Sequence, residues 1–346
     1  MNAILDEAYA RLSGTGPEWG GNLSNHGPMA AEVLVRRGCA DQVSGWVDAY
    51  LGRLDEMPAP TEKVTDQNWA QALGDFRRIG DWSEYLDAKV TEKPWREVLA
   101  DWWPRLLPGI VAGATHGVIR TSHAVRALRS GDESPEALRE LARGLAWWGA
   151  RFTRVPGFAD LAGSLSATEA LESVPRIPSQ DGNLATRFGR LGSLASFPGS
   201  LASLRAATDP EDARSRLAEL VDAATLKYLT HGHASPVLLV HTATAPNAVL
   251  HTLPVLPKDM WAPSLAAAWA ASAAILSTYA PVEGAPRGEL PAAPADSDPI
   301  AEALDRAAVN GDEHVIKFTD TAVEVYERTG NSDALAASVR VTQLLG

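Results

Sequence analysis

One stretch of the sequence, residues 113–123, reads Gly113-Ala114-Thr115-His116-Gly117-Val118-Ile119-Arg120-Thr121-Ser122-His123. It lies in a run from Pro108 to Arg129 whose apolar residues recur at helical spacing, so the pattern predicts a single helix over 108–129. Gly109, Gly113 and Gly117 recur along this run, and each glycine costs about 1 kcal/mol relative to alanine inside a helix. A helix with this cost needs a packing reason, and we expect a neighbour to approach its backbone closely beside His116.

Two interpretations of His116 stay open. The first is that it points into a buried site and binds a ligand there. The second is that it is an ordinary core histidine with a hydrogen-bond partner, since buried histidines are common in protein interiors.

The composition favours a large globular protein. The chain has 346 residues, of which 45% are apolar, enough for a sizeable core. Its net charge of −12 makes non-specific nucleic-acid binding a poor hypothesis. The single cysteine, Cys39, excludes an intrachain disulfide and a cysteine-rich metal site.

No targeting or membrane segment is indicated. The sequence begins Met1-Asn2-Ala3-Ile4-Leu5-Asp6-Glu7, without the basic and apolar regions of a signal peptide. The longest apolar run, Ser264 to Ala280, is shorter than the roughly 20 residues that span a bilayer. We therefore expect an alanine-rich buried helix there, and a cytoplasmic protein without a membrane or nucleic-acid partner.

Tryptophan is in excess, with 11 Trp among the aromatic residues. Trp103, Trp147 and Trp148 lie in helical patterns and are predicted to be core residues. A flat aromatic ligand would also suit some of these rings.

The fold class is predicted to be all-α. Helical periodicity recurs along the chain, for example over 67–75, 81–91 and 210–228, and sustained strand patterns are missing. We predict a single helical domain over 1–346, with a possible internal linker at 174–184. Residues 281–300 hold five prolines and are predicted to form a surface loop.

Three further histidines stand at helix starts or on apolar helices: His26, His241 and His314. Imidazoles from distant helices suit Fe, Zn, Cu or Ni. The alternative is that His26 is an ordinary solvated turn residue and that His314 lies on an ordinary solvated helix face. Lys317 lies one turn after His314, where burial would favour its neutral form. A neutral amine can add carbon dioxide and become an anionic carbamate, which would supply an oxygen ligand.

Four motifs in this order resemble the questin oxidase-like proteins of fungal and bacterial polyketide pathways, and the resemblance covers nearly the whole chain. They are Ser24-Asn25-His26-Gly27-Pro28, Gly113-Ala114-Thr115-His116-Gly117-Val118-Ile119-Arg120, Val240-His241-Thr242-Ala243-Thr244 and Asp312-Glu313-His314-Val315-Ile316-Lys317.

The resemblance implies an oxygenase that uses Fe(II) and dioxygen to open a ring of an anthraquinone-like substrate by Baeyer–Villiger-type or related C–C cleavage. It also implies the metal ligands, which would be His26, His116, His241, His314 and the carboxylated Lys317. Fungal members carry an extra histidine after the Asn-His pair and another in the second motif. Here those places hold residues near Met29 and Arg120, so the fungal substrate does not carry over directly.

Other residues are candidates for supporting roles. His123, Arg120 and Tyr228 are proposed to act in proton transfer or substrate orientation, with Asn25 and Thr242 orienting ligands. We assign His231, His233 and His251 to structural or surface positions.

Two alternative functions stay open. The same ligands could hold zinc and activate water in a hydrolase, or the chain could be a helical protein that binds a small apolar ligand without turnover. The substrate, a use of NADPH, and the oligomeric state do not follow from the sequence.

Overall fold

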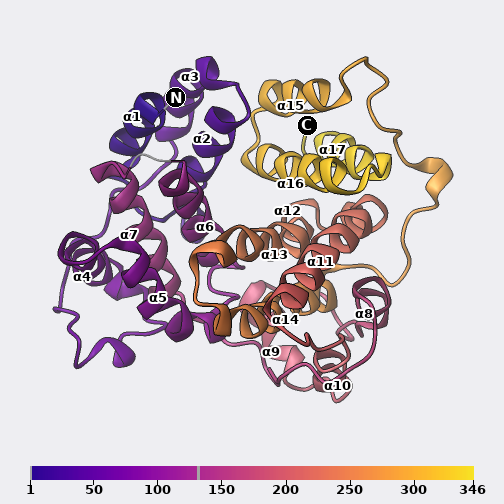
Figure 1. Cartoon of the computed structure of the whole chain (residues 1–346), viewed down its shortest axis with the longest axis horizontal. Helices are drawn as coiled ribbons and strands as arrows, with labels where there is room; N and C mark the ends of the chain where they lie inside the picture. The colour runs from indigo at the N-terminus through magenta and orange to yellow at the C-terminus, as the bar shows by residue number, and fades with distance from the viewer. Residues whose placement is uncertain (1, 131–132) are drawn as a thin grey trace. The chain divides into compact units, whose positions relative to one another are not determined.

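The computed structural model describes residues 2–130 and 133–346, and it is all-α (Figure 1). In these residues the only sheet is an antiparallel pair of two-residue strands, β1 (Glu18–Trp19) and β2 (Leu23–Ser24). The predicted fold class is therefore confirmed.

The chain folds into two compact units. The first comprises the residues up to Arg154 together with Pro254–Pro257, and the second comprises Val155–Leu253 and Lys258–Gly346. The predicted linker at 174–184 lies inside the second unit, between two of its helices. The single domain over 1–346 stays a prediction.

Helices make up most of the first unit. Its helices are α1 (Asn2–Leu12), α2 (Gly27–Arg36), η1 (Ala40–Gln42), α3 (Val43–Leu51), η2 (Trp69–Gln71), η3 (Phe76–Arg78), α4 (Ile79–Glu92), α5 (Trp95–Leu106), η4 (Leu107–Gly109), α6 (His116–Arg129) and α7 (Pro135–Ala150), where η marks a 3-10 helix.

Helices α6 and α7 pack closely because small residues face the partner. A Cβ atom on Gly117 would lie 2.8 Å from the Cα of Trp148, and one on Gly144 would lie 2.9 Å from the backbone nitrogen of Thr121. Both distances are too short for real side chains. The expected packing reason for Gly117 is therefore confirmed.

The predicted single helix over 108–129 is wrong. Gly113, Ala114 and Thr115 have positive φ angles of 54°, 56° and 74°. The turns before them therefore end at this point, and α6 begins only at His116. A left-handed run cannot continue a right-handed helix, because L-residues lose free energy in that conformation.

The predicted helix over 67–75 is also wrong, since this segment forms only the short η2 and turns.

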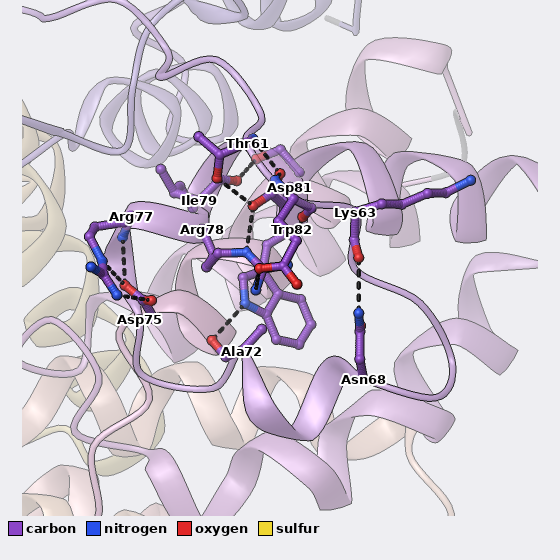
Figure 2. A network of polar contacts seen from close by, with 12 residues as sticks. Thr61, Lys63, Asn68, Ala72, Asp75, Arg77, Arg78, Ile79, Asp81 and Trp82 are labelled. Atoms are coloured by element: carbon purple, nitrogen blue, oxygen red, sulfur yellow. Dashed lines mark hydrogen bonds and ion pairs between the residues drawn. The ribbon is translucent and has the colours of Figure 1, made fainter.

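The loop that precedes η2 is fixed by Asp81, in the first turn of α4 (Figure 2). The buried Asp81 carboxylate accepts hydrogen bonds from the backbone N–H groups of Thr61 and Glu62, at 2.7 and 2.8 Å, and from Arg78 Nε at 2.6 Å. Side-chain anchoring thus replaces regular helix in this part of the chain.

The second unit is also helical. Its segments are α8 (Ala167–Ser173), α9 (Leu184–Leu191), α10 (Phe197–Leu201), α11 (Pro210–His231), η5 (Gly232–Ala234), α12 (Pro236–Leu239), α13 (His241–Thr252), η6 (Leu253–Val255, which leads into the first unit), η7 (Lys258–Met260), α14 (Trp261–Tyr279), η8 (Arg287–Glu289), α15 (Pro299–Asn310), α16 (Glu313–Thr329) and α17 (Ser332–Leu345). The predicted loop at 281–300 contains only η8 before α15 begins.

Helix α14 is the alanine-rich helix that the sequence predicts. Every residue from Ser264 to Tyr279 is buried. The segment Lys258–Tyr279 is long and apolar enough to cross a membrane, but 83% of its most apolar window is buried in the structure. That burial is typical of a core helix.

Candidate functional site

His26 and His116 meet inside the first unit. Their Nε2 atoms lie 2.6 Å apart, and their ring centroids lie 4.6 Å apart at an interplanar angle of 66°. Both side chains are buried. Residues 90 positions apart in the sequence therefore present the same ring nitrogen to each other.

His26 is positioned by the turn before α2, where it is the N-cap residue. Its backbone N–H donates to the Tyr50 hydroxyl at 2.9 Å. The neighbouring Asn25 side chain donates to the Gly16 carbonyl at 2.8 Å and accepts from the Gly27 N–H at 3.0 Å. These bonds fix the backbone on both sides of the imidazole.

His116 is positioned by the left-handed run before it. Non-glycine residues in this conformation cost about 1–3 kcal/mol each, and two of them, Ala114 and Thr115, stand in sequence here. This run brings the Gly113 carbonyl within 2.5 Å of His116 Nδ1. The imidazole also stacks on Trp147, with centroids 5.7 Å apart.

The hydrogen bond to Gly113 decides the chemistry of the His116 ring. A carbonyl can only accept, so Nδ1 carries a proton, and in the neutral imidazole Nε2 therefore has the lone pair. Metal-bound histidines are oriented in this way, by donating the other ring N–H to a carbonyl or carboxylate.

The separation of the two Nε2 atoms is compatible with either of two states. If His26 Nε2 is protonated, the pair forms one N–H···N hydrogen bond. If both lone pairs face a common ion at about 2.1 Å and at right angles, the nitrogens lie about 3 Å apart. The observed 2.6 Å is a few tenths of an ångström shorter, so a small outward shift of either ring would fit a metal.

Charged groups surround α6 beyond His116. Arg120 is buried and makes a bidentate ion pair with Glu140, at 2.5 and 2.8 Å. His123 Nδ1 lies 2.7 Å from Glu32 Oε2, and Arg126 and Arg36 contact the same carboxylate. The structure thus places two of the predicted supporting residues, Arg120 and His123, in contact with buried carboxylates.

In the second unit, His241 and His314 lie near each other. Their ring centroids are 6.2 Å apart at 68°. Asp312 caps α16 by accepting from the His314 and Val315 N–H groups, and its Oδ1 lies 3.3 Å from His314 Nδ1. This carboxylate favours a proton on Nδ1, which leaves Nε2 of His314 as the ligand atom.

His241 is positioned by a helix that restarts at a break. The chain leaves α12 at Leu239 and begins α13 at His241, and Pro246 lies inside α13. Proline has no N–H, so the carbonyl four residues earlier, on Thr242, loses its helical donor. Ser272 Oγ of α14 donates to that carbonyl at 2.8 Å and so stabilises the first turn that carries His241.

Lys317 is buried one turn after His314. Burial lowers the pKa of its amine to about 7, although Glu313 and Asp312 oppose that shift. In the described residues, the structure gives its Nζ no hydrogen bond or ion pair. A sizeable fraction of this amine is therefore neutral near pH 7.

Tyr228 lies in the same unit but has a structural partner. Its hydroxyl donates to the Pro236 carbonyl at 3.2 Å, and its ring packs on Phe318 at 4.3 Å. The catalytic role of Tyr228 stays a prediction, as do those of His123 and Arg120. His251, assigned to a structural position, lies 2.7 Å from Glu324.

The sequence analysis missed several features around these two pairs. The left-handed run 113–115 was predicted as helix, and Glu32 and Glu140, the partners of His123 and Arg120, were not singled out. Asp312 was named only as part of the fourth motif, and its contact with the His314 ring was not predicted. Its position two residues before a histidine was the one available signal for this contact.

No protein-family model matches this chain, and no curated protein is significantly similar to it.

Proposed function

We propose that this chain is a non-haem iron-dependent oxygenase that cleaves a ring of an anthraquinone-like aromatic substrate. The observation that carries the proposal is the buried His26–His116 pair, with Nε2 atoms 2.6 Å apart and the tautomer of His116 set by a backbone carbonyl. The reaction and the substrate class come from the resemblance of the four motifs.

The donor set suits iron. Imidazole is a ligand for Fe, Zn, Cu and Ni. In both His116 and His314, Nδ1 faces an oxygen atom that can accept a hydrogen bond from it. Lys317 would add an anionic oxygen by losing a proton and binding carbon dioxide as a carbamate. Bound iron would activate dioxygen, which the aromatic substrate cannot do by itself.

The protein's own residues would hold the ligands and exclude water. His26, His116, His241, His314 and Lys317 are all buried, so their side chains are shielded from water. Metal binding requires the histidines in their neutral form. The resemblance implies that these five residues serve one ion, and this implication can be tested by stoichiometry.

The test is the metal content of anaerobically purified protein, measured by mass spectrometry on wild type and on His116→Ala, His241→Ala and Lys317→Ala. We expect about one iron per wild-type chain and loss of iron in both histidine variants. The exposed His233 provides the matched control, His233→Ala, which should keep its iron.

Each other outcome has a defined meaning. Full iron in Lys317→Ala would remove the carbamate but leave the histidine site. Stoichiometric zinc, without oxygen consumption after iron loading, would favour the hydrolase. No metal after reconstitution would refute both and favour a helical binding protein.

A further inference from the structure

Several aromatic side chains of the first unit are connected to His116 through Trp147, and the proposed function leaves them without a role. In the first unit Trp82, Trp102, Trp103, Trp147 and Trp148 are all buried. Packing alone would explain each ring singly. Ring contacts and neighbouring chain positions, however, connect them into one series that starts at His116.

The inner end of the series begins at His116. Its imidazole stacks on Trp147 at 5.7 Å and 29°, and Trp147 Nε1 donates to Glu18 at 3.0 Å. The next residue along α7, Trp148, contacts Trp103 of α5 edge to face at 5.2 Å. Trp147, beside α6, and Trp148, beside α5, are therefore consecutive residues of α7.

The outer part continues on α5 and α4. Trp102, which precedes Trp103, lies 5.5 Å from Trp82, 5.2 Å from Trp69 and 5.7 Å from Tyr85. Trp82, shown in Figure 2, donates its N–H to the Ala72 carbonyl at 3.1 Å. In these ring contacts the centroids lie 5.2–5.7 Å apart. The steps Trp147–Trp148 and Trp103–Trp102 instead join chain neighbours, whose Cα atoms lie about 3.8 Å apart.

Tyr85 differs from the tryptophans because a base is in contact with it. Its hydroxyl donates to Asp66 Oδ1 at 2.5 Å, and this carboxylate is exposed and also bound by Lys89. The guanidinium of Arg105 lies 4.9 Å from the centre of the Trp102 ring and 5.2 Å from that of Trp69. A neighbouring cation disfavours positive charge on those indoles by Coulomb repulsion. Tyr85 would pass its proton to Asp66 only on losing an electron, so that its radical carries no positive charge.

We propose that this series, His116–Trp147–Trp148–Trp103–Trp102–Tyr85, carries oxidising equivalents from the histidine pair to the surface, where Tyr85 and Asp66 receive them. The proposal rests on the proposed function, which supplies a one-electron oxidant when iron and dioxygen react without substrate. The series would protect the site by removing that oxidising equivalent.

The last step balances in electrons and protons. One electron passes from Tyr85 to the Trp102 radical cation, while the phenolic proton passes to the Asp66 carboxylate. The products are neutral Trp102, a neutral tyrosyl radical and protonated Asp66. A soluble thiol or ascorbate would then return one electron, and Asp66 would return the proton.

The first experiment needs no metal. Azide radicals from pulse radiolysis take one electron from tryptophan, and the tyrosyl absorbance then grows as the tryptophanyl absorbance decays. We expect this growth to be first order and independent of protein concentration in wild type. It should be lost in Tyr85→Phe and unchanged in Trp269→Phe, a buried tryptophan of the second unit. Unchanged growth in Tyr85→Phe would overturn the proposal.

The second experiment tests the inner end. Iron-loaded protein is exposed to dioxygen without substrate, frozen, and examined by electron paramagnetic resonance. We expect a tyrosyl signal in wild type and in Trp269→Phe, and its loss in Trp103→Phe or, if that variant is unstable, in Trp148→Phe. An undiminished signal in a folded, iron-containing Trp103 or Trp148 variant would overturn the route. Failure to bind iron would refute the proposed function and leave the first experiment to decide the series.

Discussion

Glu32 gives the most quantitative prediction of the structure. Its carboxylate is buried in α2, 2.7 Å from His123 Nδ1, 3.4 Å from Arg36 Nε and in contact with Arg126. Burial alone would raise its pKa. The charges of Arg126, His123 and Arg36 outweigh that effect and lower the pKa from 4.5 to about 2.

The sign of the pH dependence follows from this lowered pKa. The ionised carboxylate stabilises the folded state at any pH above 4.5, and this stabilisation is lost as the pH falls towards 2. The shift is worth about 3 kcal/mol at pH 7 and about 2 kcal/mol at pH 3.5. Glu32→Gln mimics the protonated side chain, so its destabilisation should decrease by roughly 1 kcal/mol between these two pH values.

The assay is urea unfolding of wild type and Glu32→Gln at pH 7 and pH 3.5, followed by circular dichroism. The exposed Glu84 of α4 provides the control, because Glu84→Gln should change the unfolding free energy by no more than about 0.5 kcal/mol. An equal loss for Glu32→Gln at both pH values, or a loss below about 1 kcal/mol at pH 7, would refute the charge argument.

Three further predictions concern packing and anchoring. Gly117→Ala should destabilise by about 1–2 kcal/mol, because the clash with Trp148 outweighs the gain in helix propensity; an unchanged melting temperature would contradict the close packing. Ser272→Ala should cost about 1–3 kcal/mol by leaving the Thr242 carbonyl without a donor, and Ser277→Ala, on the same helix, provides the comparison in urea unfolding. Asp81→Asn should loosen the loop before α4, which limited proteolysis would detect as faster cleavage near residues 58–62; equal cleavage rates would count against the anchor.

The sequence alone predicted the fold class and the helices at 81–91 and 210–228. Residue patterns at helix starts are local: Ser134, Asp209 and Asp312 each stand immediately before a helix and accept the backbone hydrogen bond that a cap of this residue type makes. The apolar periodicity of 81–91 likewise needs no distant contact to be recognised.

Tertiary structure decided what surrounds the candidate site. The left-handed run at 113–115 looks like helix in sequence, because Ala114 and Thr115 carry no signal for positive φ and only the folded chain holds them there. The contact of His26 with His116, and the position of Glu32 beside His123, join residues about 90 positions apart. Such pairs depend on how helices pack, and spacing along one chain segment cannot encode them.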